Sequence, residues 1–237
     1  MRALLIIAAI CLGVGKPTPM QAGDRGTDAR SVAGWEAVGR LNIGGKGMCT
    51  GALIAPDVVL TAAHCLFDPH NGRKIAPETI RFDAGLSGNT AKATRMVSRA
   101  FLHPEYIHVR NGQAQIGHDL AVLKLNRPIN GADITPFATD ARPERGDAVG
   151  VISYTQEQAN SPILQQPCQV LARQAETLVM NCEVEFGASG APVFAVQGGA
   201  HPRLVSVISA KAAMGNRPVS VGTVLDRALQ ILLQRAG

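Results

Sequence analysis

Three short segments of the chain each hold one residue that could take part in nucleophilic catalysis. His64 lies in Thr-Ala-Ala-His-Cys, Asp119 lies in His-Asp-Leu-Ala-Val-Leu, and Ser189 lies in Gly-Ala-Ser-Gly-Ala-Pro. A serine hydroxyl is a weak nucleophile, so it needs a base to accept its proton and a carboxylate to fix the tautomer of that base. Taken together and in this order, the three segments predict such a constellation.

Each of these residues also has an ordinary structural explanation when it is considered alone. A histidine in an apolar segment is usually packed in a core, an aspartate before a strand usually belongs to a turn, and a serine between glycines usually lies in a loop. Three matching contexts in one chain make these explanations weaker. The other histidines have no such context, and we expect structural roles for them: His70, His103, His108, His118 and His201.

The elements that position these residues are predicted to be short strands. Apolar runs recur at spacings typical of an all-β protein. The predicted strands are 37–43, 48–54, 58–61, 79–84, 93–102, 120–125, 147–153, 163–173, 178–183, 191–196, 203–210 and 218–224. Turn signals separate many of them: Asn71-Gly72, Asn111-Gly112, Asn130-Gly131 and Gly198-Gly199. A polar stretch at 135–146 is predicted to link two β units.

The last segment of the chain has a different period. Apolar residues recur at helical spacing within 224–235, with Asp226 near the start and Arg235 near the end, which suits the helix dipole. This pattern predicts an amphipathic helix packed on the body of the protein. A helix on a membrane surface is the alternative, but it would need more basic residues on its polar face.

The first 22 residues have the pattern of a secretory signal. Met1-Arg2 precede an apolar run at 3–15, and the small residues Ala22-Gly23 follow. The run is shorter than the about 20 residues that a membrane-spanning helix needs. We predict cleavage near Ala22, with an uncleaved membrane anchor as the alternative, and a mature protein that is secreted or periplasmic.

Charge gives little reason to expect a nucleic-acid partner. The whole chain carries a formal net charge of +5, which falls to +3 when Arg2 and Lys16 leave with the signal. The remaining lysines and arginines are scattered, whereas nucleic-acid binding usually needs a basic patch. We therefore expect no nucleic-acid binding.

Cysteine usage predicts a disulfide-bonded protein. Of five cysteines, Cys11 lies in the signal, and the four that remain allow three connectivities. We pair Cys49 with Cys65 and Cys168 with Cys182, because each pair closes a local loop of roughly 15 residues in an oxidising compartment. A metal site is the alternative, but the chain shows no Cys-x-x-Cys or paired-histidine spacing.

The three segments resemble the chymotrypsin-fold (trypsin-like) serine proteases. The residues that carry this resemblance are Cys-Thr-Gly-Ala-Leu-Ile at 49–54 and Val-Leu-Thr-Ala-Ala-His-Cys at 59–65, Phe-Leu-His-Pro-Glu-Tyr at 101–106 and Asp-Leu-Ala-Val-Leu-Lys-Leu at 119–125, and the hexapeptide at 187–192. The resemblance implies an all-β fold of two antiparallel six-stranded β-barrels with a C-terminal α-helix. Residues 23–136 would form the barrel with His64 and Asp119, and residues 137–237 the barrel with Ser189 plus the helix.

The resemblance also implies the role of each site residue. Ser189 would attack the scissile carbonyl, His64 would carry the proton to the leaving amine, and Asp119 would hold the imidazole. The backbone N–H groups of Gly187 and Ser189 would form the oxyanion hole, and no cofactor or metal is needed. Activity should rise with pH as His64 loses its proton.

The chain departs from the digestive members of that family next to the nucleophile. Those proteases carry an aspartate there that pairs with the new N-terminal amine after zymogen cleavage, but this chain has Ala188. A convincing Ile/Val-Val-Gly-Gly start is also missing. We therefore expect an oxyanion hole that forms without that charge pair, as in the bacterial secreted glutamyl-endopeptidase-like group, which this chain resembles. A collapsed, inactive hole is the alternative.

The substrate pocket gives conflicting signals. Glu183, six residues before Ser189, falls where trypsin-like members have the aspartate that selects lysine or arginine, although it could also simply face solvent. Ser209 and Lys211 fall on the later strand that lines the pocket in the family. Lys211 could narrow the pocket, neutralise Glu183 or favour an acidic side chain, so the sequence leaves the specificity open.

These observations together predict a secreted or periplasmic serine endopeptidase. We expect a polypeptide substrate, a protein inhibitor as a second potential partner, a monomer, and no membrane anchor once the signal is removed. The main rival is a protease-like secreted binding protein with little or no turnover, since fold alone does not separate the two. An esterase is a nearer alternative, because the same acyl chemistry cleaves esters.

Overall fold

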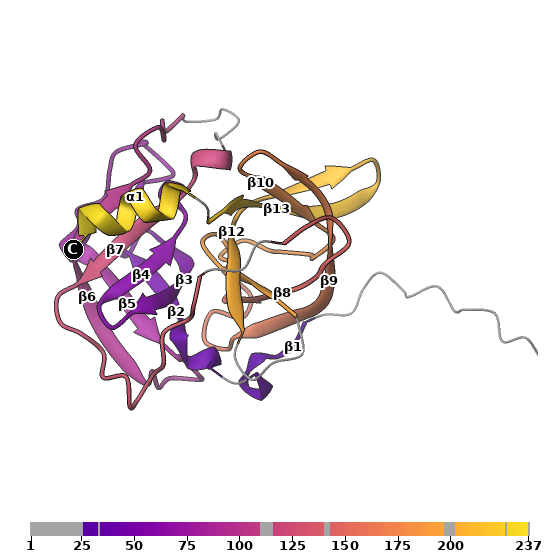
Figure 1. The fold of residues 1–237 in the computed structure, drawn as a ribbon. Coiled ribbons are helices and arrows are strands. Elements are labelled where there is room, and N and C mark those ends of the chain that lie inside the picture. Colours follow the sequence, from indigo (N-terminus) through magenta and orange to yellow (C-terminus); the bar gives the residue numbers. More distant parts are fainter. Residues whose placement is uncertain are drawn as a thin grey trace, which may run out of the picture.

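The structure is a computed structural model that describes residues 26–32, 34–109, 116–139, 143–196, 202–225 and 227–236. Within these residues the chain forms two antiparallel β-barrels (Figure 1). The predicted signal, its cleavage site, Cys11 and His201 lie outside the described residues, as do the predicted turns at Asn111-Gly112 and Gly198-Gly199.

The first half of the chain forms the first barrel. It consists of β2 (Val38–Ile43), β3 (Gly47–Ala55), β4 (Val58–Thr61), β5 (Ile80–Ala84), β6 (Ala93–Leu102) and β7 (Ala121–Leu125). The strands follow the order β2-β3-β4-β7-β6-β5, and pairing of β2 with β5 closes the barrel. Alternate residues point inward, and Leu41, Leu53 and Phe82 are fully buried in its core.

The second half of the chain forms the second barrel, which carries Ser189 in the loop between β10 and β11, called the nucleophile loop below. It consists of β8 (Ala148–Ser153), β9 (Ile163–Gln174), β10 (Thr177–Met180), β11 (Pro192–Ala195), β12 (Arg203–Met214) and β13 (Arg217–Val224). The strands follow the order β9-β10-β13-β12-β11-β8, and pairing of β8 with β9 closes the barrel. The predicted all-β fold of two six-stranded barrels with a C-terminal helix is therefore confirmed.

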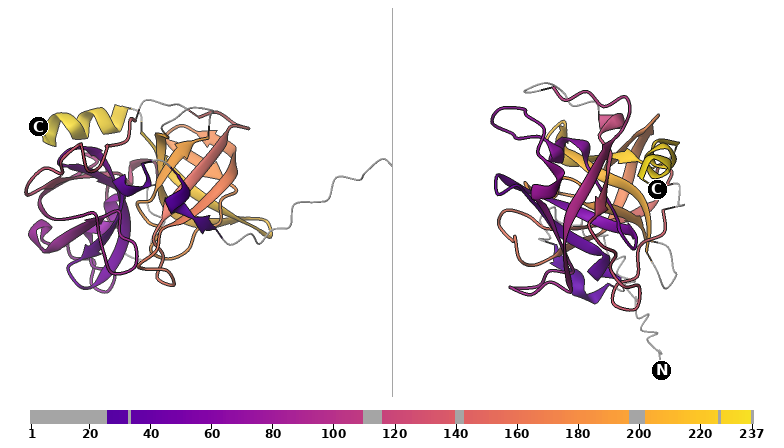
Figure 2. Two further views of the ribbon diagram at one scale, coloured as in Figure 1. Left: turned by 90° about the horizontal axis from the view of Figure 1, so that it is seen from below. Right: turned by 90° about the vertical axis from the view of Figure 1, so that its left-hand side faces the viewer.

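Each end of the described chain packs on the barrel formed by the other half (Figures 1 and 2). Strand β1 (Thr27–Asp28) pairs with β9 of the second barrel. Helix α1 (Arg227–Ala236) packs against β6 and β7 of the first barrel, where Ala228, Leu229 and Leu232 are buried. A membrane-surface helix is therefore ruled out, because the first barrel already covers the apolar face. Across the described residues, we find no helix that is long and apolar enough to span a membrane.

Three predicted boundaries differ from the structure by three residues or more. The helix was expected to begin at Val224, but this residue pairs with Ser206 in β13 and the helix begins at Arg227. Strand β12 continues to Met214, beyond the predicted end at 210, because it forms a long hairpin with β13. Strand β10 ends at Met180, since the chain then turns toward the Cys168–Cys182 disulfide.

Short 3₁₀ helices occupy the connections between strands: η1 (Ala29–Ser31), η2 (Trp35–Ala37), η3 (Ala63–Leu66), η4 (Pro77–Thr79) and η5 (Ile116–His118). Two of them position the candidate catalytic residues, because η3 contains His64 and η5 ends directly before Asp119. The Cys49–Cys65 disulfide joins η3 to β3, with the two Cα atoms 6.3 Å apart. This covalent link holds the short histidine-bearing helix against the barrel wall.

Candidate active site

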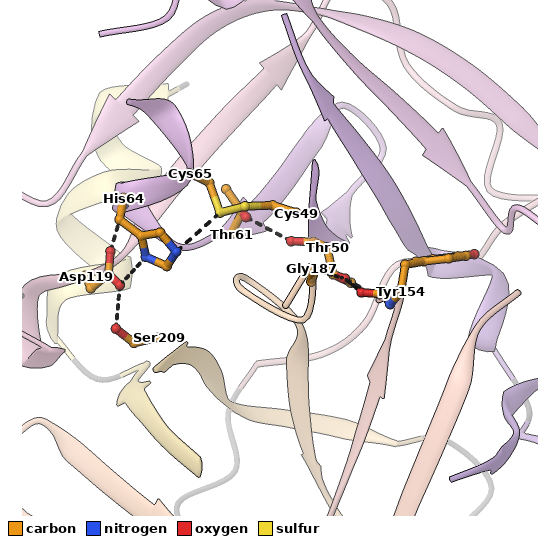
Figure 3. The surroundings of a disulfide bond; sticks show 9 residues. All are labelled: Cys49, Thr50, Thr61, His64, Cys65, Asp119, Tyr154, Gly187 and Ser209. Atoms are coloured by element: carbon orange, nitrogen blue, oxygen red, sulfur yellow. Dashed lines mark hydrogen bonds and ion pairs between the residues drawn. A yellow bond between two sulfur atoms is a disulfide. The ribbon is translucent and has the colours of Figure 1, made fainter. Parts of the chain in front are cut away.

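The structure brings His64 and Asp119 into direct contact. Nδ1 of His64 lies 2.7 Å from Oδ2 of Asp119, and the backbone N–H of His64 donates to Oδ1 at 2.8 Å. The hydroxyl of Ser209, from the second barrel, donates to Oδ2 of the same carboxylate (Figure 3). Residues of both barrels therefore orient this carboxylate, and the carboxylate orients the imidazole.

Asp119 remains ionised despite its complete burial. Burial by itself raises the pKa of a carboxyl group, because it removes water from the charged form. The hydrogen bonds from His64 and Ser209, together with the charge of His64, outweigh this effect and lower the pKa of Asp119 below its usual value. A buried carboxylate with this bond to Nδ1 of His64 stabilises the imidazolium form of that histidine.

Ser189 lies in the loop between β10 and β11, against the segment that leads into His64. The backbone N–H of Thr50 donates to the Ser189 carbonyl at 2.8 Å. A Cβ on the next residue, Gly190 (φ +78°), would lie 2.1 Å from Oγ1 of Thr61 and 3.0 Å from the Ala62 nitrogen. Only glycine allows so close an approach of the nucleophile loop to the segment before His64.

The structure does not join Ser189 to His64 by a hydrogen bond among the residues that it describes. Nε2 of His64 instead lies 3.9 Å from Sγ of Cys65, and the His64 side chain is 30% exposed. In proteins without substrate such catalytic bonds are often long and tighten only in the complex. The arrangement therefore holds the base in place with one ring nitrogen still available.

Within residues 187–191, the backbone N–H groups of Gly187 and Ser189 have no acceptor in the described part of the chain. The N–H group of the residue after each of them is occupied, since Ala188 donates to the Glu185 carbonyl at 3.0 Å and Gly190 donates to the Ile208 carbonyl at 2.8 Å. Gly187 has a φ of +101°, and a Cβ there would lie 3.0 Å from the Tyr154 carbonyl oxygen. These two free donors can bind a negatively charged oxygen.

Ala188 is completely buried within the apolar core of the second barrel. The residues of this cluster include Val151, Val193, Val205 and Ile208. An ionised carboxylate in this position would carry a large desolvation cost without a bound cation. The alanine therefore matches its apolar surroundings and offers no carboxylate to an ammonium group.

A cavity of about 330 Å³ lies between the first part of the nucleophile loop and strands β12 and β13. Its lining residues are Glu183, Val184, Glu185, Lys211, Ala212, Pro218 and Val219. Nζ of Lys211 pairs with Oε2 of Glu185 at 3.1 Å and lies 4.1 Å from the centre of the Phe186 ring. Glu183 is exposed and has no ion-pair partner among the described residues. Of the three predicted pocket residues, two therefore line this cavity.

Ser209, the third predicted pocket residue, directs its side chain to Asp119 instead. The pairing register of β12 with β13 shifts between Ile208 and Ala210, so Ser209 lies at a β-bulge. A bulge re-aims the side chain that it contains, and position counting along the sequence cannot detect this.

Cys49, Cys65 and His64 also lie close together, with potential ligand atoms within 4.8 Å of one another. The two sulfurs are already bonded to each other as a disulfide. Metal ligation by cysteine requires the thiolate. This group is therefore a structural link beside the site, and the second predicted pair, Cys168 and Cys182, is likewise joined.

Comparison with known proteins identifies the family. The family model described as Trypsin matches residues 24–229. The chain belongs to the trypsin family. This membership confirms the predicted resemblance to chymotrypsin-fold serine proteases.

Individual relatives in the trypsin family come from distant organisms. The chain is 31% identical over 146 residues to a trypsin-like protease of Streptomyces glaucescens, which covers 58% of this chain and 48% of that protein. It is 30% identical over 145 residues to kallikrein 1-related peptidase b21 of Mus musculus, covering 57% of this chain and 51% of that protein. The matches thus span about half the length of these two relatives.

A solved structure extends the likeness to nearly the whole fold. The structure of a Glu endopeptidase in complex with MPD matches with a TM-score of 0.72 over 90% of this chain and 97% of that chain. Sequence identity in this match is 21%, so the match concerns the fold of the trypsin family and not the specificity.

Sequence reasoning missed several residues near the site of this trypsin-family chain. Thr50 contacts the nucleophile loop, and its only sequence signal was its place directly after Cys49.

His118 also has partners that were not foreseen, since its Nε2 lies 3.3 Å from Glu105 and 3.2 Å from Glu176. The ring of His103 stacks on that of His118 with centroids 4.7 Å apart, and burial lowers the pKa of His103. His118 therefore links the two barrels next to Asp119, and His103 packs against it.

Proposed function

We propose that this protein is a serine endopeptidase that cleaves peptide bonds through an acyl-enzyme intermediate. The observation that carries the proposal is the contact of His64 with a buried, ionised Asp119 beside a loop with two free N–H donors. The sequence signal at 1–22 and the two disulfides support a secreted or periplasmic protein. We further propose that it acts as a monomer.

In the proposed reaction, Ser189 Oγ attacks the carbonyl carbon while Nε2 of His64 takes the hydroxyl proton. The carbonyl oxygen becomes negatively charged and binds the N–H groups of Gly187 and Ser189. The imidazolium, stabilised by Asp119, then gives its proton to the leaving amine, and an ester with Ser189 remains. Water, deprotonated by the same histidine, attacks this ester and releases the acid and the free serine.

We propose that Glu183 and Lys211 line the pocket for the substrate side chain before the cleaved bond, and that Ser209 acts through Asp119. The charge of Lys211 is compensated by Glu185, whereas the carboxylate of Glu183 is uncompensated at the cavity. This charge distribution favours a lysine or arginine side chain over an acidic one.

A peptide library tests both the activity and this preference. We expect cleavage after lysine or arginine, and we expect Glu183→Gln to lower kcat/KM for these substrates about fivefold, the size of an exposed ion pair. Glu78→Gln, which removes an exposed carboxylate from the first barrel, is the matched control and should change nothing. Cleavage after glutamate that Glu183→Gln leaves intact would contradict the assignment.

The buried alanine beside Ser189 predicts that activity does not depend on a free N-terminal amine. Adding one alanine before the mature N-terminus should leave kcat/KM within about twofold, because Ala188 offers no carboxylate for an ammonium group. Kinetic assay of both forms, with their N-termini verified by mass spectrometry, checks this expectation. A loss of a hundredfold or more would mean that the terminal amine shapes the site after all.

A further inference from the structure

Thr50, on strand β3, contacts the nucleophile loop at two points, of which Figure 3 shows the one at Gly187. Its hydroxyl donates to the Gly187 carbonyl at 3.0 Å and accepts the N–H of Tyr154 at 3.0 Å. Its backbone N–H donates to the Ser189 carbonyl at 2.8 Å. The residue is fully buried, so water cannot readily replace the hydroxyl. One threonine of the first barrel thus holds two carbonyls of a loop in the second.

These contacts are part of a set that fixes every carbonyl of the segment from Phe186 to Ser189. Phe186 O accepts from the Gln156 N–H at 2.8 Å, and Ala188 O accepts from the Ala191 N–H at 2.9 Å. In a trans peptide the N–H points opposite to the C=O. The bond from Gln156 therefore fixes the orientation of the Gly187 N–H, which points away from Gln156. Among these carbonyls, only that of Gly187 depends on a side chain, Thr50.

We propose that Thr50 is a positioning residue. By holding the Gly187 carbonyl, it fixes the peptide that lies between the two oxyanion donors, the N–H groups of Gly187 and Ser189. The inference rests on the proposed peptidase function. Ala188 removes the charge pair that would otherwise fix this loop, and the neutral hydrogen bond from Thr50 fixes it instead. Because Cys49 and Cys65 join Thr50 to the segment that carries His64, the same strand positions the base and the oxyanion donors.

The test compares Thr50→Val, which keeps the shape but removes the hydroxyl, with Thr50→Ser, which keeps the hydroxyl. We expect Thr50→Val to lower kcat about 10- to 100-fold with KM within twofold. This loss is smaller than the about 10²–10³-fold cost of deleting an oxyanion donor, because the donor is misoriented and not removed. Thr50→Ser should stay within threefold of the wild type. A peptide boronate, whose tetrahedral adduct uses the hole, should bind more weakly to Thr50→Val in proportion to kcat.

Ser206→Ala is the matched control, because it removes another fully buried hydroxyl that donates to a backbone carbonyl. Ser206 Oγ donates to the Thr223 carbonyl at 2.7 Å and not to the loop that contains Ser189. We expect a loss of thermal stability in both variants but near wild-type kcat in Ser206→Ala. Equal losses of kcat in the two variants, or wild-type kcat in Thr50→Val, would overturn the inference.

Two further outcomes are informative. If Thr50→Val does not fold, Thr50→Ala and Thr50→Ser can be compared at low temperature, because the first lacks the hydroxyl and the second keeps it. Equal kcat values in these two variants would overturn the inference. If the wild-type protein neither cleaves peptides nor reacts with a fluorophosphonate, both this inference and the proposed function fail. Wild-type turnover with an unaffected Thr50→Val variant overturns only the role of Thr50.

Discussion

Replacing Ser189 with alanine is expected to lower kcat for a peptide substrate by about 10⁶-fold, because removing one member of a working triad costs nearly as much as removing all three. The variant lacks the oxygen that forms the acyl-enzyme, so the remaining turnover comes from the oxyanion donors and from substrate binding alone. Hydrolysis of a fluorogenic peptide, followed long enough to detect slow turnover, measures this loss.

The matched control for this variant is Ser206→Ala. Ser206 is a buried serine of the same barrel, and its hydroxyl donates to the Thr223 carbonyl at 2.7 Å, away from His64. This variant should lose some thermal stability but retain kcat below its melting temperature. If Ser189→Ala retained more than about a hundredth of the wild-type rate, another nucleophile would have to be sought.

Asp119→Asn is expected to lower kcat by about 10⁴-fold, as the corresponding change does in a well-studied triad. The carboxylate oxygens accept three hydrogen bonds, two from His64 and one from Ser209. An amide has one oxygen, so its NH₂ group must face one of these donors. If the amide oxygen of the variant still accepts the backbone N–H of His64, the NH₂ group must face Nδ1 of the His64 ring. The imidazole then carries its proton on Nε2 and cannot accept one from Ser189.

Two controls test whether Asp119 acts by fixing the tautomer of His64: the Ser209→Ala variant and the pH profile of activity. Ser209→Ala removes one of the three donors without changing the tautomer of His64, so we expect a loss of only about tenfold, the size of one hydrogen bond to a charged group. The pKa of Asp119 is lowered, so this carboxylate stays ionised down to pH values below the usual aspartate range, and its stabilising effect is lost only as the pH falls through that lowered value. Titration of Asp119 should therefore contribute nothing to the pH profile near neutral pH. A loss below tenfold in Asp119→Asn would contradict the assigned role.

The strands and the three catalytic segments could be predicted because their signals are local. An apolar run bounded by turn residues specifies a strand without reference to the rest of the chain, and the surroundings of His64 and Ser189 are short motifs. The two disulfides were also predictable, since Cys49 and Cys168 each have a partner within 16 residues. Local signals thus accounted for the strands and the disulfides and indicated the candidate site residues, whereas the two-barrel architecture was predicted from the family resemblance.

The contacts that orient the site could not be predicted, because they join distant segments. Thr50 and Gly187 are 137 residues apart, and no periodicity connects them. The position of Ser209 depends on a bulge in β12, which a count of residues from the nucleophile does not reveal. Likewise, the sequence could not decide whether Lys211 neutralises Glu183. In the structure Lys211 pairs with Glu185, and this depends on how β12 and the loop after β10 face the cavity.

Reaction of the folded protein with a fluorophosphonate probe, followed by mass spectrometry of its peptides, tests the central claim most directly. Such probes react with serines that a neighbouring base activates, and the tetrahedral adduct requires a formed oxyanion hole. We predict a single adduct on Ser189 in the folded wild-type protein and none in Ser189→Ala. Folded wild-type protein without an adduct on Ser189 would contradict the claim and favour a protease-like binding protein.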